Sequence, residues 1–407
     1  MPRSHSSARA GWFAPRTRPK VALLIETSNA YARGLLQGVV TYIREHEPWS
    51  FYLMEQGRGD DPPSWLKHWD GDGIIARIES RKIAKAIVNS KLPSVDLSAG
   101  RHIPTIPWVE TDDREIARLA TNHFLERGFR HFAYCGDDRF NWSRWRGDHF
   151  CKLLETAGHR CHIFVPLRQQ SDTQIRAMED WLRQLPKPVG VFACYDIRGQ
   201  QVLDACRNAG LAVPDEIAVL GVDNDELLCE LASPHLSSVV PDTHRAGYEA
   251  AALLARMMKG EHLPVVEVRI APIGVHGRQS TDVLATDDPH VVRAVRFIRD
   301  HACEPIKVRD LLRAVPLSRK VLETRFKKLL NHTLHDEIVR VKVDRVKQLL
   351  VNTDLTLADI AGRTGFEHSE YLSVIFKRET GVTPAVYRVD QGNRLNDQRK
   401  ARYSRAF

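Results

Sequence analysis

Residues 357–376 read LADIAGRTGFEHSEYLSVIF, and this stretch has the pattern of two short helices joined by a tight turn. Apolar residues recur at helical spacing on either side of Gly365. They are Leu357, Ile360 and Ala361 before the turn, and Tyr371, Leu372 and Phe376 after it. Because glycine readily adopts the left-handed conformation, Gly365 suits a tight turn between the helices. The stretch therefore predicts a helix-turn-helix unit, a motif that binds duplex DNA.

The polar side of the second helix is predicted to enter the major groove of DNA. Its side chains have the size and hydrogen-bonding groups that can meet base edges, and its basic residues can meet phosphates. The candidates for DNA contact here are His368, Ser369, Glu370, Ser373, Lys377 and Arg378. We expect the last two to lie near phosphate.

A similar layout over about residues 304–330 predicts a first helix-turn-helix unit. Apolar Val308, Leu311 and Leu312 lead to a turn at 314–317, and Ser318 is expected to cap the helix that follows. The candidates for DNA contact in this unit are Ser318, Arg319, Lys320, Glu323 and Arg325. Proline cannot adopt a positive φ, so Pro316 indicates that either the geometry or the register of this turn differs.

Between the units, residues 333–350 have the apolar spacing of one linking helix.

The distribution of charge along the chain agrees with the motifs. Residues 286–407 contain 24 Lys and Arg against 16 Asp and Glu, whereas residues 1–285 contain 35 of each sign, so the C-terminal part carries the whole net charge of +8. A basic surface raises affinity for any duplex but carries no sequence information. The alternative is a helical bundle without a nucleic-acid partner, and the tandem motifs argue against it.

The C-terminal residues also resemble a known signature. The run Ala361–Phe366, followed by Gly381–Pro384, is similar to the AraC-type DNA-binding signature, although Leu372 stands where phenylalanine is common. The resemblance implies an all-α DNA-binding domain. The expected parts are this domain at 284–390, helix-turn-helix units at about 304–330 and 354–380, and a basic C-terminal tail at 391–407.

Residues 21–283 alternate short apolar stretches with helical ones, the pattern of parallel sheets covered by helices on both faces. The predicted strands are Val21–Ile25, Ser50–Met54, Gly73–Ala76, Pro93–Val95, Pro107–Glu110, His131–Cys135, His162–Val165, Gly190–Cys194, Ile217–Val222, Leu236–Val239 and Val265–Ile270. So many strands exceed one ordinary sheet and favour two Rossmann-like lobes in series. The ligand site of such a fold lies at the C-terminal ends of the strands.

Polar residues that follow these strands, with two on a helix, predict a sugar site. Carboxylates and amides can pair with sugar hydroxyls, and an aromatic ring can cover the C–H face of the sugar. The candidates are Asp223, Asn224, Arg146, Trp142, Asp196, Tyr31 and Arg33. Other roles stay open: Asp196 and Asp223 could cap helices, Trp142 could pack between the lobes, and Arg146 could serve an ion pair.

This region resembles the LacI-type and periplasmic-binding-protein sugar sensors, notably in Ala218–Asn224 and Gly247–Ala251. LacI-type repressors carry their DNA-binding unit at the N-terminus, whereas this chain has an AraC-type unit at its C-terminus. That combination is similar to the XylR-type family of xylose operon regulators, and Gly71–Gly73 and Phe297–Arg299 match it as well.

The resemblance to XylR-type regulators implies a transcriptional activator. It would bind D-xylose in the interlobe cleft, bind direct-repeat operator sites as a homodimer, and act on RNA polymerase. Arg77 departs from the family, which tends to have an acidic residue there. A different pentose or related sugar therefore stays open, as does a repressor that sugar releases.

Other classes of protein fit the sequence less well. No apolar run approaches the ~20 residues of a membrane span, and residues 1–20 have five basic residues and no apolar core, so a flexible basic tail and a cytoplasmic location are expected. Motifs of hydrolases, metalloproteases and nucleotide-binding enzymes are missing, so we expect neither an enzyme nor a bound metal or cofactor. A sugar-transport component would need an export signal.

Overall fold

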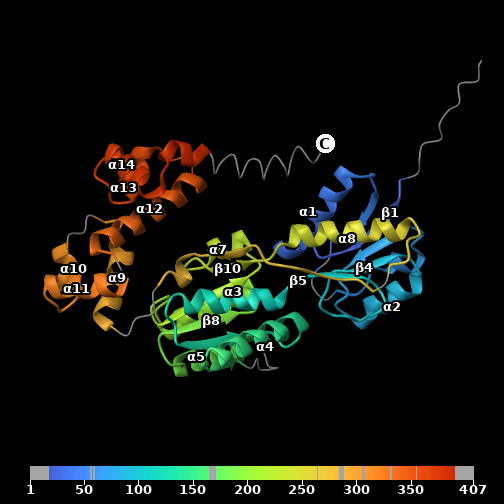
Figure 1. Ribbon diagram of the computed structural model, residues 1–407, viewed down its shortest axis with the longest axis horizontal. Coiled ribbons are helices and arrows are strands. Elements are labelled where there is room, and N and C mark those ends of the chain that lie inside the picture. The colour runs from blue at the N-terminus through green and yellow to red at the C-terminus, as the bar shows by residue number, and fades with distance from the viewer. Residues whose placement is uncertain are drawn as a thin grey trace, which may run out of the picture. The chain divides into compact units, whose positions relative to one another are not determined.

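The computed structural model describes residues 18–389, except for positions 56, 58–59, 165–170, 264, 284–287, 305–307, 331 and 354. The chain divides into two compact units, residues 1–283 and residues 284–407, which are drawn from blue to yellow and from orange to red in Figure 1. The predicted fold class is confirmed: two parallel-sheet α/β lobes are followed by an all-helical C-terminal region.

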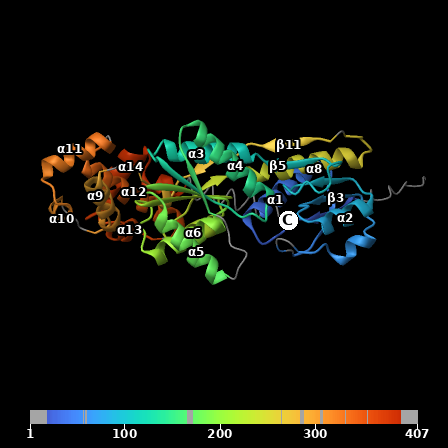
Figure 2. The same cartoon turned by 90° about the horizontal axis from the view of Figure 1, so that it is seen from below.

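The first lobe contains a six-stranded parallel sheet in the order β11-β5-β4-β3-β1-β2. Figure 2 shows β11 beside β5, although the two strands are far apart in the sequence. The strands are β1 (Lys20–Leu24), β2 (Ser50–Leu53), β3 (Gly73–Ala76), β4 (Ser94–Asp96), β5 (Trp108–Thr111) and β11 (Glu267–Ile270). The helices are α1 (Ala30–Glu45), α2 (Arg81–Ser90), α8 (Thr243–Met258) and the 3₁₀ helix η1 (Ser64–His68). β3, β4 and β5 are buried throughout. The apolar run of β3 is typical of a central parallel strand, whereas β4 and β5 also bury the polar residues Ser94, Asp96, Glu110 and Thr111.

Two glycines let α1 and α8 pack closely in the first lobe. A Cβ atom at Gly38 would lie 1.9 Å from the His244 carbonyl oxygen, and one at Gly247 would lie 1.9 Å from the Leu35 carbonyl oxygen. Side chains at these positions would separate the helices. The close packing fixes the start of α1, and therefore Tyr31, on the lobe.

The second lobe contains a six-stranded sheet in the order β12-β10-β9-β8-β6-β7. Its strands are β6 (His131–Cys135), β7 (Cys161–Phe164), β8 (Val189–Ala193), β9 (Ile217–Val222), β10 (Ser237–Val240) and β12 (Gly274–His276). Its helices are α3 (Asp113–Leu125), α4 (Asn141–Thr156), α5 (Ser171–Gln184), α6 (Asp196–Ala209), α7 (Glu226–Leu231) and the 3₁₀ helix η2 (Gln279–Thr281). The chain crosses between the lobes after β5, after β10 and after β11.

The strand β12 is absent from the sequence prediction. It pairs antiparallel with β10, and its residues Gly274, Val275 and His276 include a single large apolar side chain, too few to give a recognisable pattern. The eleven predicted strands are all present and differ from the observed ones only at their ends. Sequence periodicity therefore finds the buried strands but not this short edge strand.

The C-terminal unit is helical where the structure describes it. Its helices are α9 (Pro289–His301), α10 (Val308–Ala314), α11 (Arg319–Leu330), α12 (Leu334–Asn352), α13 (Leu357–Arg363) and α14 (Ser369–Thr380). One hydrophobic core joins α9, α10 and α11 to the start of α12, and another joins α13 and α14 to the rest of α12. The long helix α12, which Thr333 caps, is therefore shared by two small helical cores. Among the residues that the structure describes, no helix combines the length and apolar character needed to cross a membrane.

The two helix-turn-helix turns differ, in keeping with the difference that Pro316 suggested. Gly365 has a φ of 68° in the turn between α13 and α14, whereas no residue from 315 to 318, between α10 and α11, has a positive φ. A short bond from the Leu317 amide to the Val315 carbonyl (2.7 Å) closes the first turn. Pro316 is accommodated because that turn needs no left-handed residue.

Residues 281–289 contain three Asp, one Pro and no apolar stripe, a composition that predicts a short linker between the units, and the structure makes this linker shorter still. Thr281 is fully buried and ends η2, and Asp288 caps α9 by accepting bonds from the His290 and Val291 amides. Both ends of the predicted linker thus belong to the units themselves, and residues 284–287 lie outside the described residues.

Candidate functional sites

A small cavity lies between the two lobes of the N-terminal unit. Tyr31, Arg77 and Glu110 line it from the first lobe, and Trp142, Arg146 and Asp223 line it from the second. Its volume of about 20 Å³ is room for roughly one water molecule. Two guanidinium groups, two carboxyl groups, a phenol and an indole therefore converge from both lobes on one point.

Arg146 is held rigidly on α4. Its Nε donates to Asp113 Oδ1 (2.6 Å), its Nη1 donates to the Cys194 carbonyl oxygen (2.6 Å), and its guanidinium lies 4.8 Å from the centre of the Trp142 ring. Although burial opposes the charged form, Asp113 and Asp223 raise the pKa of Arg146 above its ordinary value. Arg146 is thus a charged donor with a fixed orientation beside an aromatic plate.

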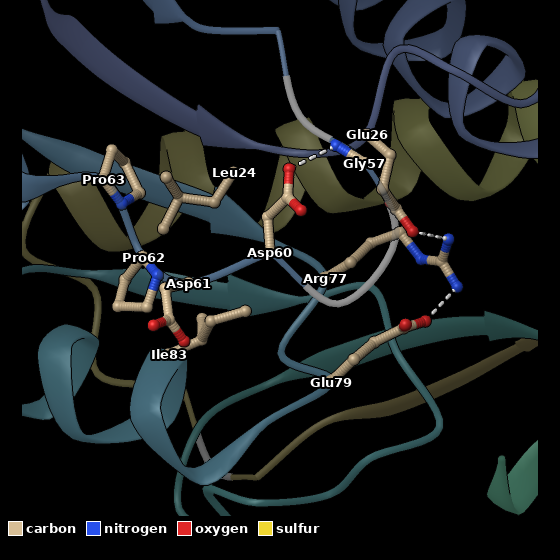
Figure 3. Close-up of a pocket in the computed structure, with 10 residues that line it drawn as sticks. All are labelled: Leu24, Glu26, Gly57, Asp60, Asp61, Pro62, Pro63, Arg77, Glu79 and Ile83. Carbon is tan, nitrogen blue, oxygen red and sulfur yellow. Dashed lines mark hydrogen bonds and ion pairs between the residues drawn. The ribbon is translucent and has the colours of Figure 1, made fainter. Parts of the chain in front are cut away.

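Arg77 is the second buried arginine of the small cavity, and Figure 3 draws it in the wall of another pocket, within the first lobe, beside Glu26 and Glu79. Its Nη1 donates to Glu26 Oε1 (2.6 Å), its Nη2 pairs with Glu79, and its guanidinium lies 5.3 Å from the centre of the Tyr31 ring. Burial opposes its charge, but Glu26 and Glu79 raise the pKa of Arg77. The residue that departs from the family pattern therefore lies in the wall of the cavity.

Glu110 is a buried acid with a strongly altered pKa. Burial, and then repulsion by Asp113, raises its pKa to about 8, although Arg101 donates to its Oε2 at 2.9 Å. Burial likewise raises the pKa of Tyr31 to about 12, and its hydroxyl lies 3.3 Å from Thr111 Oγ1. Near neutral pH, both groups can therefore donate a proton in a hydrogen bond.

A larger cavity of about 370 Å³ shares Asp223 with the first one. Residues 28–30 line it from the first lobe. The second lobe contributes Arg139, Phe140, Tyr195, Asp196, Ile197, Asp223, Asp225 and Leu228. This volume lies within the ~300–1,000 Å³ range typical of small-molecule sites.

The loop after β9 places Asp223 between the two cavities. Asp223 and Asn224 both have positive φ values, 106° and 47°. Asp196 fixes this loop, because its Oδ2 accepts from the Asp225 amide (2.8 Å) and its Oδ1 accepts from the Ser238 hydroxyl (2.6 Å). Burial, and then the charge of Asp223, raises the pKa of Asp196 well above its ordinary value.

The structure brings four of the seven predicted sugar-site residues into the small cavity: Tyr31, Trp142, Arg146 and Asp223. Asp196 lines the larger cavity. Arg33 is exposed and donates to the Thr27 carbonyl oxygen, and the Asn224 amide oxygen accepts from Arg278 (2.9 Å). Neither of the last two lines these cavities.

Arg77 and Glu110 were not among the predicted site residues. Arg77 directly follows β3, and Glu110 lies near the end of β5, so the rule of polar groups at strand ends could have found both. Of the alternative roles, the ion pair of Arg146 with Asp113 is present. The cap of α7 is Asp225 rather than Asp223, and Asp196 is the first residue of α6, whose cap position is Tyr195.

In the C-terminal unit, the predicted DNA-contact residues lie on or beside the second helix of each motif. His368 precedes α14, which carries Ser369, Glu370, Ser373, Lys377 and Arg378; Ser318 precedes α11, which carries Arg319, Lys320, Glu323 and Arg325. Several of them already have partners. Arg319 pairs with Glu323 (2.8 Å), Arg325 with Asp288 (3.1 Å) and Arg378 with Glu379 (2.8 Å).

Three family models match separate parts of the chain. The XylR N-terminal domain matches residues 20–114, the periplasmic binding protein-like domain matches residues 121–281, and the helix-turn-helix domain matches residues 311–389. The first match covers β1–β5 of the first lobe, the second covers the second lobe together with α8 and β11 of the first, and the third lies in the C-terminal unit.

Curated relatives match over nearly the whole chain. The xylose operon regulatory protein of Escherichia coli K12 is 31% identical over 91% of this chain and 97% of its own length, and that of Haemophilus influenzae is 31% identical over 91% and 98%. A solved structure of the xylose-binding transcription activator XylR has a TM-score of 0.78 and 30% identity, covering 92% of this chain and 98% of its own. The chain therefore belongs to the XylR-type family of xylose operon regulators, which are sugar-sensing, DNA-binding transcription regulators of the AraC type and not enzymes.

Proposed function

We propose that this chain is a D-xylose-dependent transcription activator that works as a homodimer and acts on RNA polymerase. Relatives that resemble it over nine-tenths of its length carry the name of the xylose operon, and a similar solved structure is described as a xylose-binding activator. The observation that carries the proposal is the meeting of donors, acceptors and aromatic rings from both lobes at one small cavity.

In the proposed sugar site, Asp223 and Glu110 pair with sugar hydroxyls, Arg146 donates to sugar oxygens, and Trp142 covers a C–H face. Tyr31 and Arg77 complete the wall from the first lobe. Asp196 acts as a positioning residue, because it holds the loop that carries Asp223. A sugar needs more room than the small cavity alone offers, and the adjoining 370 Å³ supplies it.

The proposed mechanism is a shift between an open and a closed arrangement of the lobes. A sugar that contacts both lobes binds the closed arrangement better, and differential affinity is the only means by which a ligand shifts such an equilibrium. A nearly complete switch needs an affinity ratio of about 10⁴ between the two arrangements, or about 5.5 kcal/mol. We propose that closure changes how the C-terminal units of the dimer meet DNA.

On the DNA side, the proposed contacts follow the two helix-turn-helix motifs. Lys377 and Arg378 would neutralise phosphates, and Lys320, His368, Ser369 and Glu370 would lie in the major groove. Ser318, Arg319, Glu323, Arg325 and Ser373 complete the proposed set.

The test is a calorimetric titration of the purified protein with pentoses and hexoses, repeated with the best sugar and a promoter fragment. We expect selective binding of D-xylose that also tightens DNA binding. Selective binding of another sugar would contradict xylose specificity, and sugar-induced release from DNA would indicate a repressor. Binding of no sugar would refute the sensor proposal.

The matched variants are Asp223→Ala and Asp70→Ala, since Asp70 is a largely exposed carboxylate of the same unit. Losing a charged hydrogen-bond partner costs about 1.5–3 kcal/mol, so Asp223→Ala should weaken sugar binding by roughly 10–150-fold. Asp70→Ala should bind sugar as the wild type does, and both should keep wild-type DNA affinity without sugar. Unchanged sugar affinity in Asp223→Ala would remove this residue from the site.

A further inference from the structure

The second helices of the two motifs, α11 and α14, correspond residue by residue. Each is twelve residues long, and each position in α11 matches the residue fifty positions later in α14. The core residues fix this register, because Leu322 and Phe326 are fully buried in one motif and Leu372 and Phe376 are fully buried in the other. The two helices therefore present equivalent positions on their outer faces.

These outer faces carry apolar side chains that the cores do not use. Val374 is 65% exposed, Tyr371 is 51% exposed and Val321 is 40% exposed. On α14, Val374 lies four residues after Glu370 and three residues before Lys377, so all three share one stripe of the helix. An exposed valine among charged residues on a DNA-binding helix indicates an apolar contact within the groove.

Two hydroxyl groups of the same helices are turned back to the backbone. Ser373 Oγ donates to the Ser369 carbonyl oxygen (2.9 Å), and Thr324 Oγ1 donates to the Lys320 carbonyl oxygen (2.8 Å). Thr324 is exposed, so its methyl group is what it offers to a partner. Thr324 in α11 and Val374 in α14 occupy equivalent positions and thus both present methyl groups.

The residues one turn earlier differ in charge. Lys320 and Glu370 are equivalent and both exposed, yet one is a cation and the other an anion. In the major groove, lysine pairs with guanine acceptors, a carboxylate accepts from the cytosine amino group, and apolar groups contact the thymine methyl group. The two helices therefore both present a methyl group at one position, but they differ in the charge of the residue one turn earlier.

We infer that Thr324 and Val374 each read the methyl group of a thymine, while Lys320 and Glu370 make the two motifs prefer guanine and cytosine, respectively. The two motifs of one chain would then recognise related but unequal sequences. This inference rests on the DNA-contact faces proposed above, and it adds Thr324 and Val374 to the contacts that sequence reasoning selected.

The test starts from a duplex selected in vitro with the full chain and its best sugar. Each thymine is replaced in turn by deoxyuridine, which lacks only the methyl group. One buried methyl group is worth about 0.8 kcal/mol, so we expect about fourfold weaker binding at one thymine per motif. Val374→Ala should bind the thymine and uracil versions equally at one of these positions, and Thr324→Ser should do so at the other.

Glu370→Lys supplies the second arm, since it gives α14 the residue that α11 has. We expect its selected sequence to change from cytosine to guanine at one position of the second motif, with the first motif unchanged. Failure of the wild type to select any sequence would refute the DNA-contact faces and this inference together. A selected sequence whose uracil scan is flat, or a Val374→Ala variant that keeps the wild-type scan, would overturn this inference alone.

Discussion

Charged side chains are buried around the small interlobe cavity, whereas they are exposed on α11 and α14, the helices proposed to contact DNA. In the cleft, the side chains of Arg77 and Arg146 are only 5% and 4% exposed, and each is held by a carboxylate. On the helices, Lys320 and Lys377 are exposed, and even the paired Arg319 is 65% exposed. Basic side chains are therefore buried in the N-terminal unit and exposed to water in the C-terminal unit.

The difference reflects the ligands. Burying an ion pair costs several kcal/mol per ion in desolvation, so the two buried arginines are held in fixed geometry beside carboxylates. Fixed donors and acceptors suit a small ligand rich in hydroxyl groups. Exposed cations remain available to phosphates and gain affinity by releasing counterions.

The largest effect should come from breaking the buried ion pair between Asp113 and Arg146. Asp113→Ala leaves Arg146 buried and without its carboxylate, which typically costs about 3–5 kcal/mol of unfolding free energy. We expect about 3 kcal/mol, because removal of Asp113 also relieves its repulsion of Glu110. All eight tryptophans precede residue 284, so urea unfolding followed by tryptophan fluorescence reports on the N-terminal unit.

The matched change in the C-terminal unit is Glu323→Ala, which removes the carboxylate partner of Arg319. This pair is exposed, so the expected loss is at most about 0.5 kcal/mol, measured by circular dichroism. Similar losses of unfolding free energy in Asp113→Ala and Glu323→Ala would contradict the difference between buried and exposed ion pairs.

The sequence predicted the fold well because several buried strands have uninterrupted apolar runs, as in β3 and β9. It predicted less of the site. Residues directly after strands, such as Asp223, were found, whereas Arg33 lies on the exposed side of α1 two residues from Tyr31, and linear proximity could not separate them. Carboxylate partners such as Asp113 come from other elements, and only the tertiary structure brings them to Arg146.

The recognition helices show another limit. The sequence identifies the polar residues of α14, but not that the hydroxyl of Ser373 is already bonded to its own helix. Helical spacing predicts Tyr371 to be part of the apolar stripe, whereas in the structure it is half exposed and its ring packs edge-on against Phe366. Helical periodicity finds the face, and the structure then decides which atoms on it are available.

A second, intermediate effect concerns pH and sharpens the contrast for the cleft. Glu110 has a pKa of about 8 in the folded protein against an ordinary 4.5. Between these values the folded state keeps a proton that the unfolded state has lost, so the free energy of unfolding falls as pH rises, by up to about 1.4 kcal/mol per pH unit. Above pH 8 this contribution is flat.

Glu110→Gln should remove that part of the pH dependence. We expect the difference in unfolding free energy, Glu110→Gln minus wild type, to grow from pH 5 to pH 8 in tryptophan-detected urea unfolding. The buried acid Asp96 remains in both proteins, so its contribution cancels to first order. Removing Glu110 also relieves its repulsion of Asp113, which changes the difference in the same direction. A difference that stays constant across this range would mean that Glu110 is ionised throughout.

The smallest effect tests the exposed side of the comparison. Lys377 is an exposed residue of α14, and the next residue, Arg378, pairs with Glu379. If Lys377 neutralises one phosphate, Lys377→Ala should weaken binding to specific and random duplexes alike and lower the salt slope by about one ion.

Arg378→Ala should lower the salt slope by less, because in the wild type Arg378 has to give up its pair with Glu379 before it can bind a phosphate. Binding measured against salt concentration decides: a loss by Lys377→Ala on the specific duplex alone would show that Lys377 reads bases, and the exposed cations would then do more than supply charge.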